Sequence, residues 1–240
     1  MKNILCVKWG NKYSSEYVEK LKQQIEKHCS YDFNFYCLTD KPEKEYDLRL
    51  PQLWDKYFIP NQFWAYRKLY MFNEKLFLNM QGEEFLFFDL DVFFHNSIDY
   101  FFELEMSKPW IVRGWWNDLE HCKKNYNKGI SPLINSSVIR WNRGQLKDIY
   151  HHIEANIEYI FFTYKTIDNY FNRVWYDIRN DKSEKFNLFE KNKIYSWYKG
   201  NIFPDDMKTN ILRKDHIVCL FNNNTIEDDK AIEEVWKQNV

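Results

Sequence analysis

The 240-residue chain lacks several features that would place it in a specialised class of protein. It has no excess of basic residues, and its formal net charge of -1 argues against a nucleic-acid-binding surface. No apolar run approaches the roughly 20 residues that a membrane-spanning helix needs. Internal repeats, low-complexity tracts and linkers are absent as well. We therefore expect a single α/β domain that binds no nucleic acid.

The five cysteines are odd in number and include no Cys-x-x-Cys pair. This spacing argues against both a disulfide framework and a structural zinc site. The first residues run directly into a strand-like segment, without the charged, apolar and cleavage regions of a signal peptide. We expect reduced thiols and a cytoplasmic protein. Because no basic amphipathic helix is evident, membrane association would be peripheral at most.

Strand-like segments at 4–8 and 33–38 flank a helical segment in which Val18, Leu21 and Ile25 recur at helical spacing. This βαβ arrangement predicts parallel pairing with a right-handed crossover. Ligands in such sheets bind beyond the carboxyl ends of the strands. Here those ends carry Lys8, Trp9, Thr39 and Asp40.

The remaining pattern predicts a mixed central sheet with flanking helices. We expect further strands near 85–91, 109–116, 133–141, 195–200 and 217–221. We expect helices near 61–77, 145–158, 166–175 and 228–238, the third capped by Thr166 or Asp168. Segments 42–60, 117–130 and 179–193 are expected to be irregular.

The stretch 85–94 places two carboxylates, Asp89 and Asp91, inside an apolar run. On an extended backbone residues i and i+2 share a face, so the two side chains should converge. Burying two uncompensated carboxylates is costly unless a cation neutralises them. Two hard oxygen ligands suit Mg²⁺ or Mn²⁺. The alternative is a strand end whose acids meet solvent, a helix N-terminus or an arginine.

Several segments match a known family in their order along the chain: 7–10 with Tyr13, Trp64 with Lys68 and Phe72, 88–91, 135–138, 167–169 and 218–222. This order resembles that of the GT-A glycosyltransferases, of the family-8 type and related bacterial and viral sugar transferases. The resemblance spans nearly the whole chain. It implies one GT-A-like domain over 1–240, with a Rossmann-like nucleotide-binding half at 1–92 and an acceptor-binding half at 93–240.

The resemblance implies transfer of a sugar from a nucleotide diphosphate sugar, with a UDP-sugar favoured, to a glycan or lipid-linked acceptor. Tyr13 would stack on the base, Asp40 would accept a hydrogen bond from it, and Lys68 would contact the diphosphate ahead of Lys199 and Arg67. The donor-binding set that it implies is Val7, Lys8, Trp9, Tyr13, Thr39, Asp40, Arg67, Lys68, Leu90 and Lys199.

The resemblance also implies a metal site and a sugar site. The metal ligands would be Asp89, Asp91 and Asn222, the last standing where the family has histidine. Asn135, Asp168 and Asn169 would lie beside the transferred sugar, Asn169 in place of the usual glutamine. Asn223 and Asn224 replace glycine and lysine, so the metal geometry and a retaining outcome stay open.

The residues themselves leave more ordinary roles open. Lys68 and the other bases could be surface cations, Asp40 could cap the turn at Pro42, and Asp168 could cap a helix.

An inverting enzyme needs a carboxylate base, for which Asp168 and Asp118 are the candidates, whereas a retaining enzyme needs none. An aromatic platform for a sugar acceptor would come from Trp115, Trp116 and Trp197.

Two competing functions remain. An Asp-x-Asp after an apolar run is also typical of haloacid-dehalogenase-type phosphatases, in which the first aspartate is a nucleophile. That motif usually has Gly between the acids and opens the chain, whereas here a βαβ unit precedes it. A catalytically weak nucleotide-sugar-binding protein of the same fold is the second alternative, and Asn222 in place of histidine is its best support.

Overall fold

The computed structural model describes residues 1–52, 64–78, 80–128, 132–222 and 226–239. Its helices and strands, with η for 3-10 helices, run in this order: β1 (Lys2–Lys8), α1 (Ser15–His28), β2 (Phe33–Thr39), β3 (Asp47–Arg49), η2 (Trp64–Phe72), η3 (Glu74–Phe77), β4 (Glu84–Phe88), β5 (Val92–Phe94), α2 (Asp99–Glu103), β6 (Trp110–Arg113), α3 (Leu119–Lys124), η4 (Tyr126–Lys128), β7 (Ile134–Asn142), α4 (Lys147–Thr163), α5 (Ile167–Val174), β8 (Asn187–Leu188), β9 (Ile194–Ser196), β10 (Val218–Leu220) and α6 (Ile226–Asn239).

Among the described residues, a seven-stranded mixed sheet in the order β3-β2-β1-β4-β7-β6-β8 forms the centre of the fold. Strands β2, β1 and β4 are parallel, as the βαβ pattern predicts, and β7 runs antiparallel to β4. A smaller sheet, β5-β10-β9, lies beside it. Because β7 is reversed, its first residues lie next to the end of β4, with Val138 opposite Phe88.

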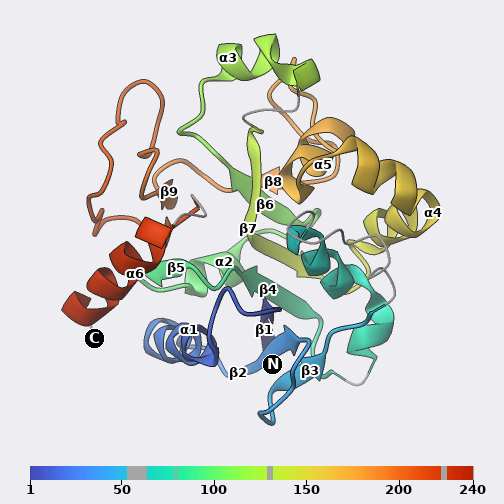
Figure 1. The fold of residues 1–240 in the computed structure, drawn as a ribbon, viewed down its shortest axis with the longest axis vertical. Coiled ribbons are helices and arrows are strands. Elements are labelled where there is room, and N and C mark those ends of the chain that lie inside the picture. Colours follow the sequence, from blue (N-terminus) through green and yellow to red (C-terminus); the bar gives the residue numbers. More distant parts are fainter. Residues whose placement is uncertain (53–63, 79, 129–131, 223–225, 240) are drawn as a thin grey trace.

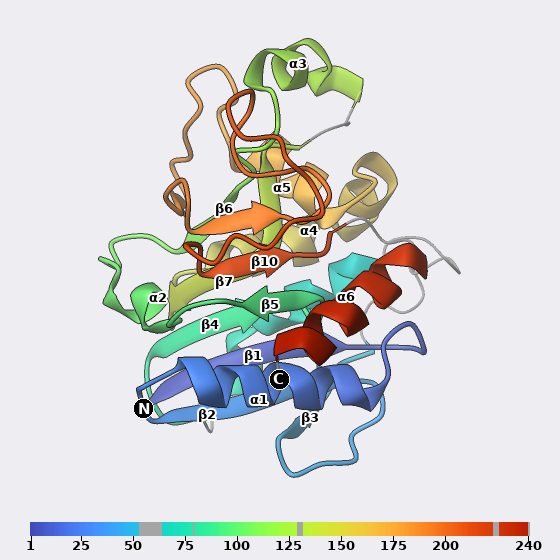
Figure 2. The same cartoon turned by 90° about the vertical axis from the view of Figure 1, so that its left-hand side faces the viewer.

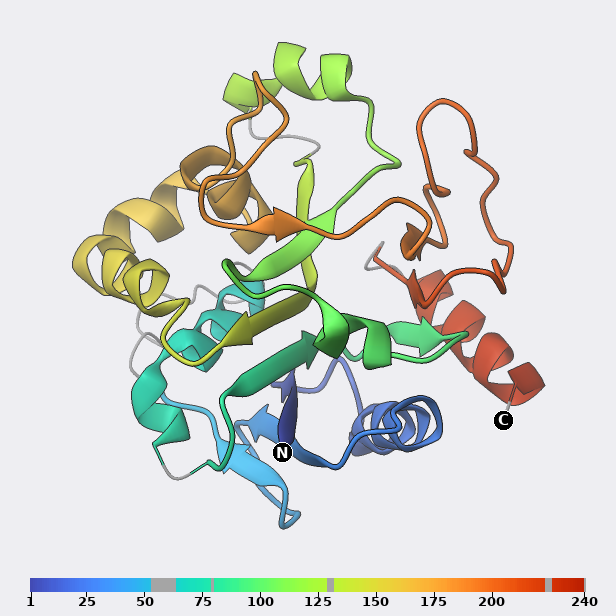
Figure 3. The same ribbon diagram turned by 180° about the vertical axis from the view of Figure 1, so that it is seen from behind.

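Alternate residues of the central strands face two separate cores, as expected for a sheet covered on both sides. On one side Ile4 and Cys6 pack with α1, α6 and the small sheet. On the other side Leu5 and Val7 pack with η2, α4 and α5. The two layers are visible on opposite sides of the sheet in Figure 1, and Figure 3 shows them from behind.

Helix α6 returns the chain to the N-terminal half (Figure 2). Its Trp236 ring meets Tyr17 of α1 edge-on, with centroids 4.9 Å apart. Lys20 of α1 lies over the same indole at 4.6 Å. The end of the chain therefore packs against the first helix.

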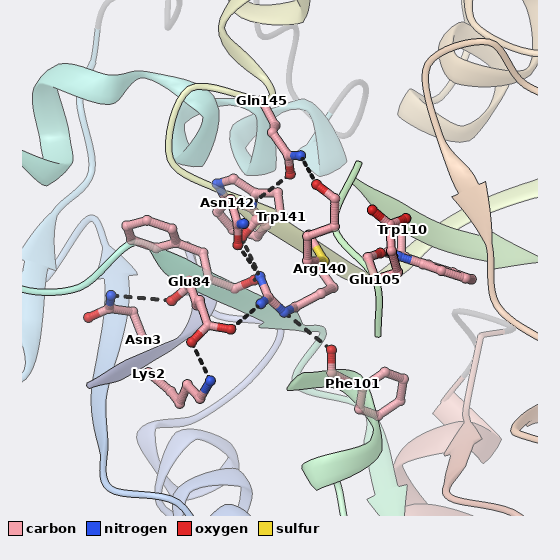
Figure 4. A network of polar contacts seen from close by, with 12 residues as sticks. Lys2, Asn3, Glu84, Phe101, Glu105, Trp110, Arg140, Trp141, Asn142 and Gln145 are labelled. Atoms are coloured by element: carbon pink, nitrogen blue, oxygen red, sulfur yellow. Dashed lines mark hydrogen bonds and ion pairs between the residues drawn. The ribbon is translucent and has the colours of Figure 1, made fainter. Parts of the chain in front are cut away.

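A fully buried arginine stabilises the sheet at the end where β4 begins (Figure 4). Arg140 of β7 pairs with Glu84 at 2.7 Å and donates hydrogen bonds to the carbonyl oxygens of Phe101 and Trp141. Glu84 also pairs with Lys2. Burial lowers the pKa of Arg140 to about 10, and Glu84 opposes this effect. These contacts satisfy a buried charge that would otherwise be costly.

Several local predictions differ from the structure. Segment 42–60 contains β3, and segment 117–130 contains α3, whose first turn Asp118 caps by accepting from the Glu120 N–H. The predicted helix at 61–77 is two 3-10 helices over its described part, and residues 61–63 lie outside the described residues. Short strands and polar helices such as these carry little apolar periodicity.

Two further corrections concern the acids. The strand ends at Phe88, so Asp89 and Asp91 lie in the bend between β4 and β5 rather than within one strand. Thr166, not Asp168, caps α5 by accepting a hydrogen bond from the Asn169 N–H at 3.2 Å. All five cysteines are free thiols, and no helix in the described part of the chain is long and apolar enough to cross a membrane.

Candidate active site

A cavity of about 270 Å³ lies where β1 and β4 end and where β7 and α5 begin. This is the edge of the sheet at which ligands bind in such folds. The cavity is lined by Val7, Trp9, Lys12, Tyr13, Ala65, Lys68, Asp89, Leu90, Asp91, Asn135, Ser136, Ser137, Thr166, Ile167, Asp168 and Asn222. Ten of these residues are among the candidates from sequence.

The buried Lys68 and the partly buried Asp89 form an ion pair at one wall of the cavity. The Lys68 ammonium lies 2.7 and 2.8 Å from the two carboxylate oxygens of Asp89 and 3.4 Å from Ser136 Oγ. Lys68 is 7% exposed. Burial by itself would lower its pKa, but Asp89, Asp168 and Asp91 outweigh that effect and raise it. Lys68 is therefore charged and held in place.

Asp91 is the second acid of the cavity. One of its oxygens accepts a hydrogen bond from the Tyr13 hydroxyl at 2.9 Å. Burial raises the pKa of Asp91 to about 7, the Asp89 charge adds to this effect, and Tyr13, Lys12 and Lys68 oppose it. A carboxylate whose ionisation is this unfavourable would be stabilised by a cation.

The backbone anchors of the two acids belong to different sheets. The Asp89 N–H donates to the Ser137 carbonyl oxygen on β7, in the large sheet, at 2.9 Å. The Asp91 carbonyl accepts from the Phe221 N–H, directly after β10 of the small sheet, at 3.0 Å. The next residue along, Asn222, thereby lies at the cavity. Its side-chain oxygen accepts a hydrogen bond from Ser196 Oγ at 2.7 Å.

Asp168 lies on the other side of the cavity, in the first turn of α5. Its oxygens accept hydrogen bonds from the Ser136 N–H at 2.9 Å and from the Asn135 amide at 3.3 Å. Burial raises the pKa of Asp168, while Lys68 and the Ser136 contacts oppose this rise. The start of β7 and the start of α5 thus present a carboxylate and an amide side by side, a pair suited to sugar hydroxyls.

Residues 9–13, between β1 and α1, carry the polar side chains that cover the acids. Tyr13 packs against Tyr17 with centroids 4.9 Å apart, and the Lys12 ammonium lies 4.7 Å from the Tyr13 ring. The Tyr13 hydroxyl therefore bonds the acids, while stacking of its ring on a base stays a prediction. Trp9 lines the cavity nearby and packs against the core under η2.

The oxygen ligands of the cavity suit a hard divalent cation, but the third protein ligand is an amide rather than a charged group. Two carboxylates and an amide oxygen converge on the cavity, and these oxygen ligands are the ones that Mg²⁺ and Mn²⁺ prefer. Asp89 and Asp91 line the same cavity, and burial raises the pKa of Asp91, so a cation between the two acids would stabilise the ionised form of Asp91. In the described part of the chain, no group of three or more histidine, cysteine or acidic side chains is placed to hold a metal. Asn222 would therefore have to supply the third protein ligand, as the sequence predicts, or water would.

Three predicted donor-binding residues lie beside the cavity rather than in its lining. Because side chains alternate along a strand, Val7 and Trp9 face the cavity while Lys8 faces the other way. Lys8 and Thr39 line a separate pocket of about 100 Å³. Asp40 accepts a hydrogen bond from the Gly10 N–H at 3.1 Å, and its other oxygen is buried without a partner among the described residues.

Other candidates also lie outside the lining of the cavity. Arg67 and Lys199 do not reach it, although the Lys199 N–H donates to Ser196 Oγ, which bonds Asn222. Asn169 is buried in α5 and is not one of the residues that line the cavity. Of the proposed aromatic platform, Trp116 is a core residue at 3% exposure. The structure describes the backbone of Trp64 but not its side chain, and Asn223 and Asn224 lie outside the described residues.

Six lining residues of the cavity were not among the candidates from sequence: Lys12, Ala65, Ser136, Ser137, Thr166 and Ile167. A lysine in an irregular loop has no periodic signal, so only its position next to Tyr13 could have pointed to it. Ser136 lies within the 135–138 segment, and its contribution is a backbone N–H and a small hydroxyl that sequence patterns do not reveal.

No protein-family model and no curated protein matches the chain. Solved structures do match it. Galactosyltransferase LgtC, in complex with donor and acceptor sugar analogues, superposes with a TM-score of 0.63 at 10% identity, over 98% of this chain and 95% of that one. A glycosyltransferase involved in glycosylation of the major capsid of PBCV-1 superposes with a TM-score of 0.56 at 14% identity, over 98% and 100% of the two chains. The predicted GT-A-like fold is thereby confirmed.

Proposed function

We propose that the chain is a metal-dependent glycosyltransferase that moves a sugar from a nucleotide diphosphate sugar, a UDP-sugar being favoured, to a glycan or lipid-linked acceptor. The observation that carries the proposal is one cavity with paired acids, Asp89 and Asp91, on one wall and Asp168 with Asn135 on the other. Its position at the carboxyl edge of a sheet shared with known glycosyltransferases supports the same conclusion.

Transfer of the sugar leaves negative charge on the departing diphosphate. A divalent cation, when bound, would neutralise part of that charge, and Asp89, Asp91 and Asn222 are the residues that would hold it. Lys68 fixes the position of Asp89, since its ammonium contacts both carboxylate oxygens. Tyr13 fixes Asp91 through its hydroxyl. These contacts set up the acids before the donor arrives.

The sugar and the base would lie at opposite ends of the cavity. Asp168 can accept, and Asn135 can donate, a hydrogen bond to a sugar hydroxyl, because both side chains line the cavity. At the other end Trp9 lines the cavity, and Asp40, outside the lining, accepts a hydrogen bond from the neighbouring Gly10 N–H. Asp168 is also the candidate carboxylate base for an inverting reaction, whereas Asp118 already caps α3.

The phosphatase alternative fits the geometry less well. Its first aspartate must attack phosphorus with an unencumbered oxygen. Both oxygens of Asp89 contact the Lys68 ammonium instead. The weak-binder alternative differs from the main proposal only in turnover, and the bond from Ser196 to the Asn222 oxygen is the observation in its favour.

A panel of UDP-, GDP- and CMP-sugars with Mn²⁺, followed by thermal shift, tests the proposal. A ligand present at 100 times its Kd stabilises the folded state by about 2.7 kcal/mol, which raises the Tm of a chain of this size by roughly 5–10 °C. Asp91→Asn should abolish this shift and any slow hydrolysis of the donor. Asp32→Asn, an exposed acid before β2, is the matched control. Retention of metal and donor binding in the double variant Asp89→Asn with Asp91→Asn would refute the proposal.

A further inference from the structure

Asn222 lies directly after β10, next to the acids of the cavity. Its neighbour Phe221 donates its N–H to the Asp91 carbonyl oxygen at 3.0 Å, so Asn222 lies on the side of the cavity that carries Asp91. An asparagine amide has two different groups, an oxygen that accepts and an N–H2 group that donates, and a half-turn of the amide exchanges them. The group that reaches the cavity therefore decides what Asn222 can bind.

Ser196 determines this orientation. It is fully buried on β9, and its hydroxyl oxygen accepts a hydrogen bond from the Lys199 N–H at 3.1 Å. The hydroxyl hydrogen then needs an acceptor, and the Asn222 oxygen, 2.7 Å away, supplies it. If the amide were turned round, two N–H donors would meet one hydroxyl oxygen, and the buried O–H would lose this acceptor. The oxygen of Asn222 is therefore held on Ser196.

The N–H2 group of Asn222 is the end of the amide that remains for a ligand. Among the described residues it has no hydrogen-bond partner, and it is not buried. Because Asn222 lines the cavity, the group can donate to a molecule that enters there. The oxygen has a second lone pair, so its bond to Ser196 does not prevent it from binding a cation.

A diphosphate in this cavity needs hydrogen-bond donors as well as a cation. With a divalent cation bound, the three carboxylates of the lining are offset by that cation and by the two lysines, which leaves only a small positive charge. A diphosphate carries more negative charge than this, so neutral N–H donors beside the cation add to its attraction. Asn222 is such a donor on the Asp91 side, whereas the amide of Asn135 is bonded to Asp168.

We propose that the N–H2 group of Asn222 donates a hydrogen bond to the diphosphate of the nucleotide donor, and that Ser196 is the positioning residue that turns this group towards the cavity. The proposal rests on the proposed function, since it assumes a nucleoside diphosphate beside a cation. It gives one amide two tasks, because the oxygen stays available to the cation while the nitrogen meets the anion. It also gives Lys199 a role through its backbone N–H rather than its ammonium.

The test is calorimetric binding of UDP and GDP at Mn²⁺ concentrations that saturate each protein, together with the affinity for Mn²⁺ alone. In Asn222→Ala, affinity for the preferred diphosphate should fall about tenfold even with the cation site filled, the size of a hydrogen bond to a charged group. Asn222→His keeps a ligand for the cation but loses the N–H2 group. It should recover the Mn²⁺ affinity that Asn222→Ala loses, while the diphosphate affinity stays about fivefold lower than in unaltered protein.

Ser196→Ala tests the orientation. Without the hydroxyl the amide can turn, so the diphosphate affinity should fall about threefold in the unaltered background and less than about twofold in an Asn222→Ala background. Ser183→Ala is the matched control, because the Ser183 hydroxyl also accepts backbone N–H groups and donates to an oxygen, but outside the cavity. It should leave both affinities unchanged.

Three outcomes would contradict these assignments. If Asn222→His restores the diphosphate affinity, Asn222 acts only through the cation, and the inference is wrong while the proposed function stands. If Ser196→Ala weakens binding equally in both backgrounds, or no more than Ser183→Ala does, Ser196 does not act through Asn222, and the inference is again wrong. If the unaltered chain binds neither UDP nor GDP with Mn²⁺, both proposals fail.

Discussion

The Tyr13 hydroxyl donates a hydrogen bond of 2.9 Å to Asp91, which joins the loop after the first strand to the acids that follow the fourth. The two residues are 78 positions apart in the sequence. Burial raises the pKa of Asp91 to about 7, and the hydrogen bond from Tyr13 lowers it. The tyrosine therefore favours the ionised form of Asp91 that a metal or a second cation would bind.

Replacing Tyr13 by phenylalanine should weaken Mn²⁺ binding roughly three- to tenfold, because a hydrogen bond to a charged group contributes about 1.5–3 kcal/mol, part of which the metal recovers. Without that bond the pKa of Asp91 rises further, so protons compete better with the metal. The deficit should accordingly be larger at pH 6.5 than at pH 8.5 in calorimetric titrations. Tyr46→Phe, which removes a hydroxyl bonded to Glu19, serves as control. Equal affinities for Tyr13→Phe and unaltered protein at pH 6.5 would contradict this role.

Lys68→Met should destabilise the fold by about 3–5 kcal/mol, the typical cost of leaving one member of a buried ion pair alone. Asp89 would lose its only ammonium partner within hydrogen-bond distance among the described residues. The double variant Lys68→Met with Asp89→Leu should recover most of this loss, since it removes both charges. Urea unfolding of the two single variants and the double variant measures the coupling. Additive losses would show that the two side chains have no coupling energy.

Asp168→Asn should lower sugar transfer by more than about a hundredfold and change nucleoside diphosphate affinity less than twofold. The oxygen that accepts from the Ser136 N–H can be kept by the amide, so the local fold should survive. The variant loses the negative charge of Asp168 beside Asn135. That charge would orient the sugar or accept a proton from the acceptor. Steady-state rates and UDP calorimetry on the same preparations separate the two effects. A loss of UDP affinity as large as the loss of rate would place Asp168 with the nucleotide instead.

Stability should fall as the pH drops from about 6.5 towards 4, in part through His95. Burial lowers the pKa of His95 to about 4, and the neighbouring His216 and His28 add to this effect. The unfolded chain takes up a proton below its ordinary pKa of about 6.5 while the folded chain does not. At pH 5 this difference costs about 2 kcal/mol. His95→Gln, which cannot titrate, should lose that much less stability than unaltered protein between pH 7.5 and 5 in urea unfolding. Identical losses in the two proteins would show that His95 is not responsible.

Much of the fold could be predicted because its strands are buried on two sides and its helices are amphipathic. The continuous apolar run along β1 and the spacing of Val18, Leu21 and Ile25 predict a βαβ unit, and the structure has one. The three-residue β3 and the polar α3 were missed, because neither buries enough apolar surface to leave a pattern. The 3-10 winding of η2 also leaves no separate signal in the sequence.

The candidate site could be predicted where a motif supplies the side chain, as for Asp89, Asp91 and Asp168. It was less predictable where the local direction of a side chain decides the outcome. Lys8 follows a cavity residue but points to the other face of its strand. Lys68 was a candidate because the segment of Trp64, Lys68 and Phe72 resembles a helix of the family, yet the sequence could not show that its ammonium would bond an acid. Contacts of this kind depend on tertiary packing, which a linear pattern does not encode.

The backbone anchors of Asp89 and Asp91 have a consequence for how the site can change. Asp89 is bonded to the large sheet through Ser137, and Asp91 is bonded to the end of the small sheet through Phe221. The distance between the two carboxylates therefore depends on how the two sheets are packed against each other. Substitutions of core residues under β5 or β10 would change this distance without touching the ligand. Because cations differ in the ligand distances that they need, substitutions of hydrophobic residues alone could change which cation the site prefers, while every polar side chain stays in place.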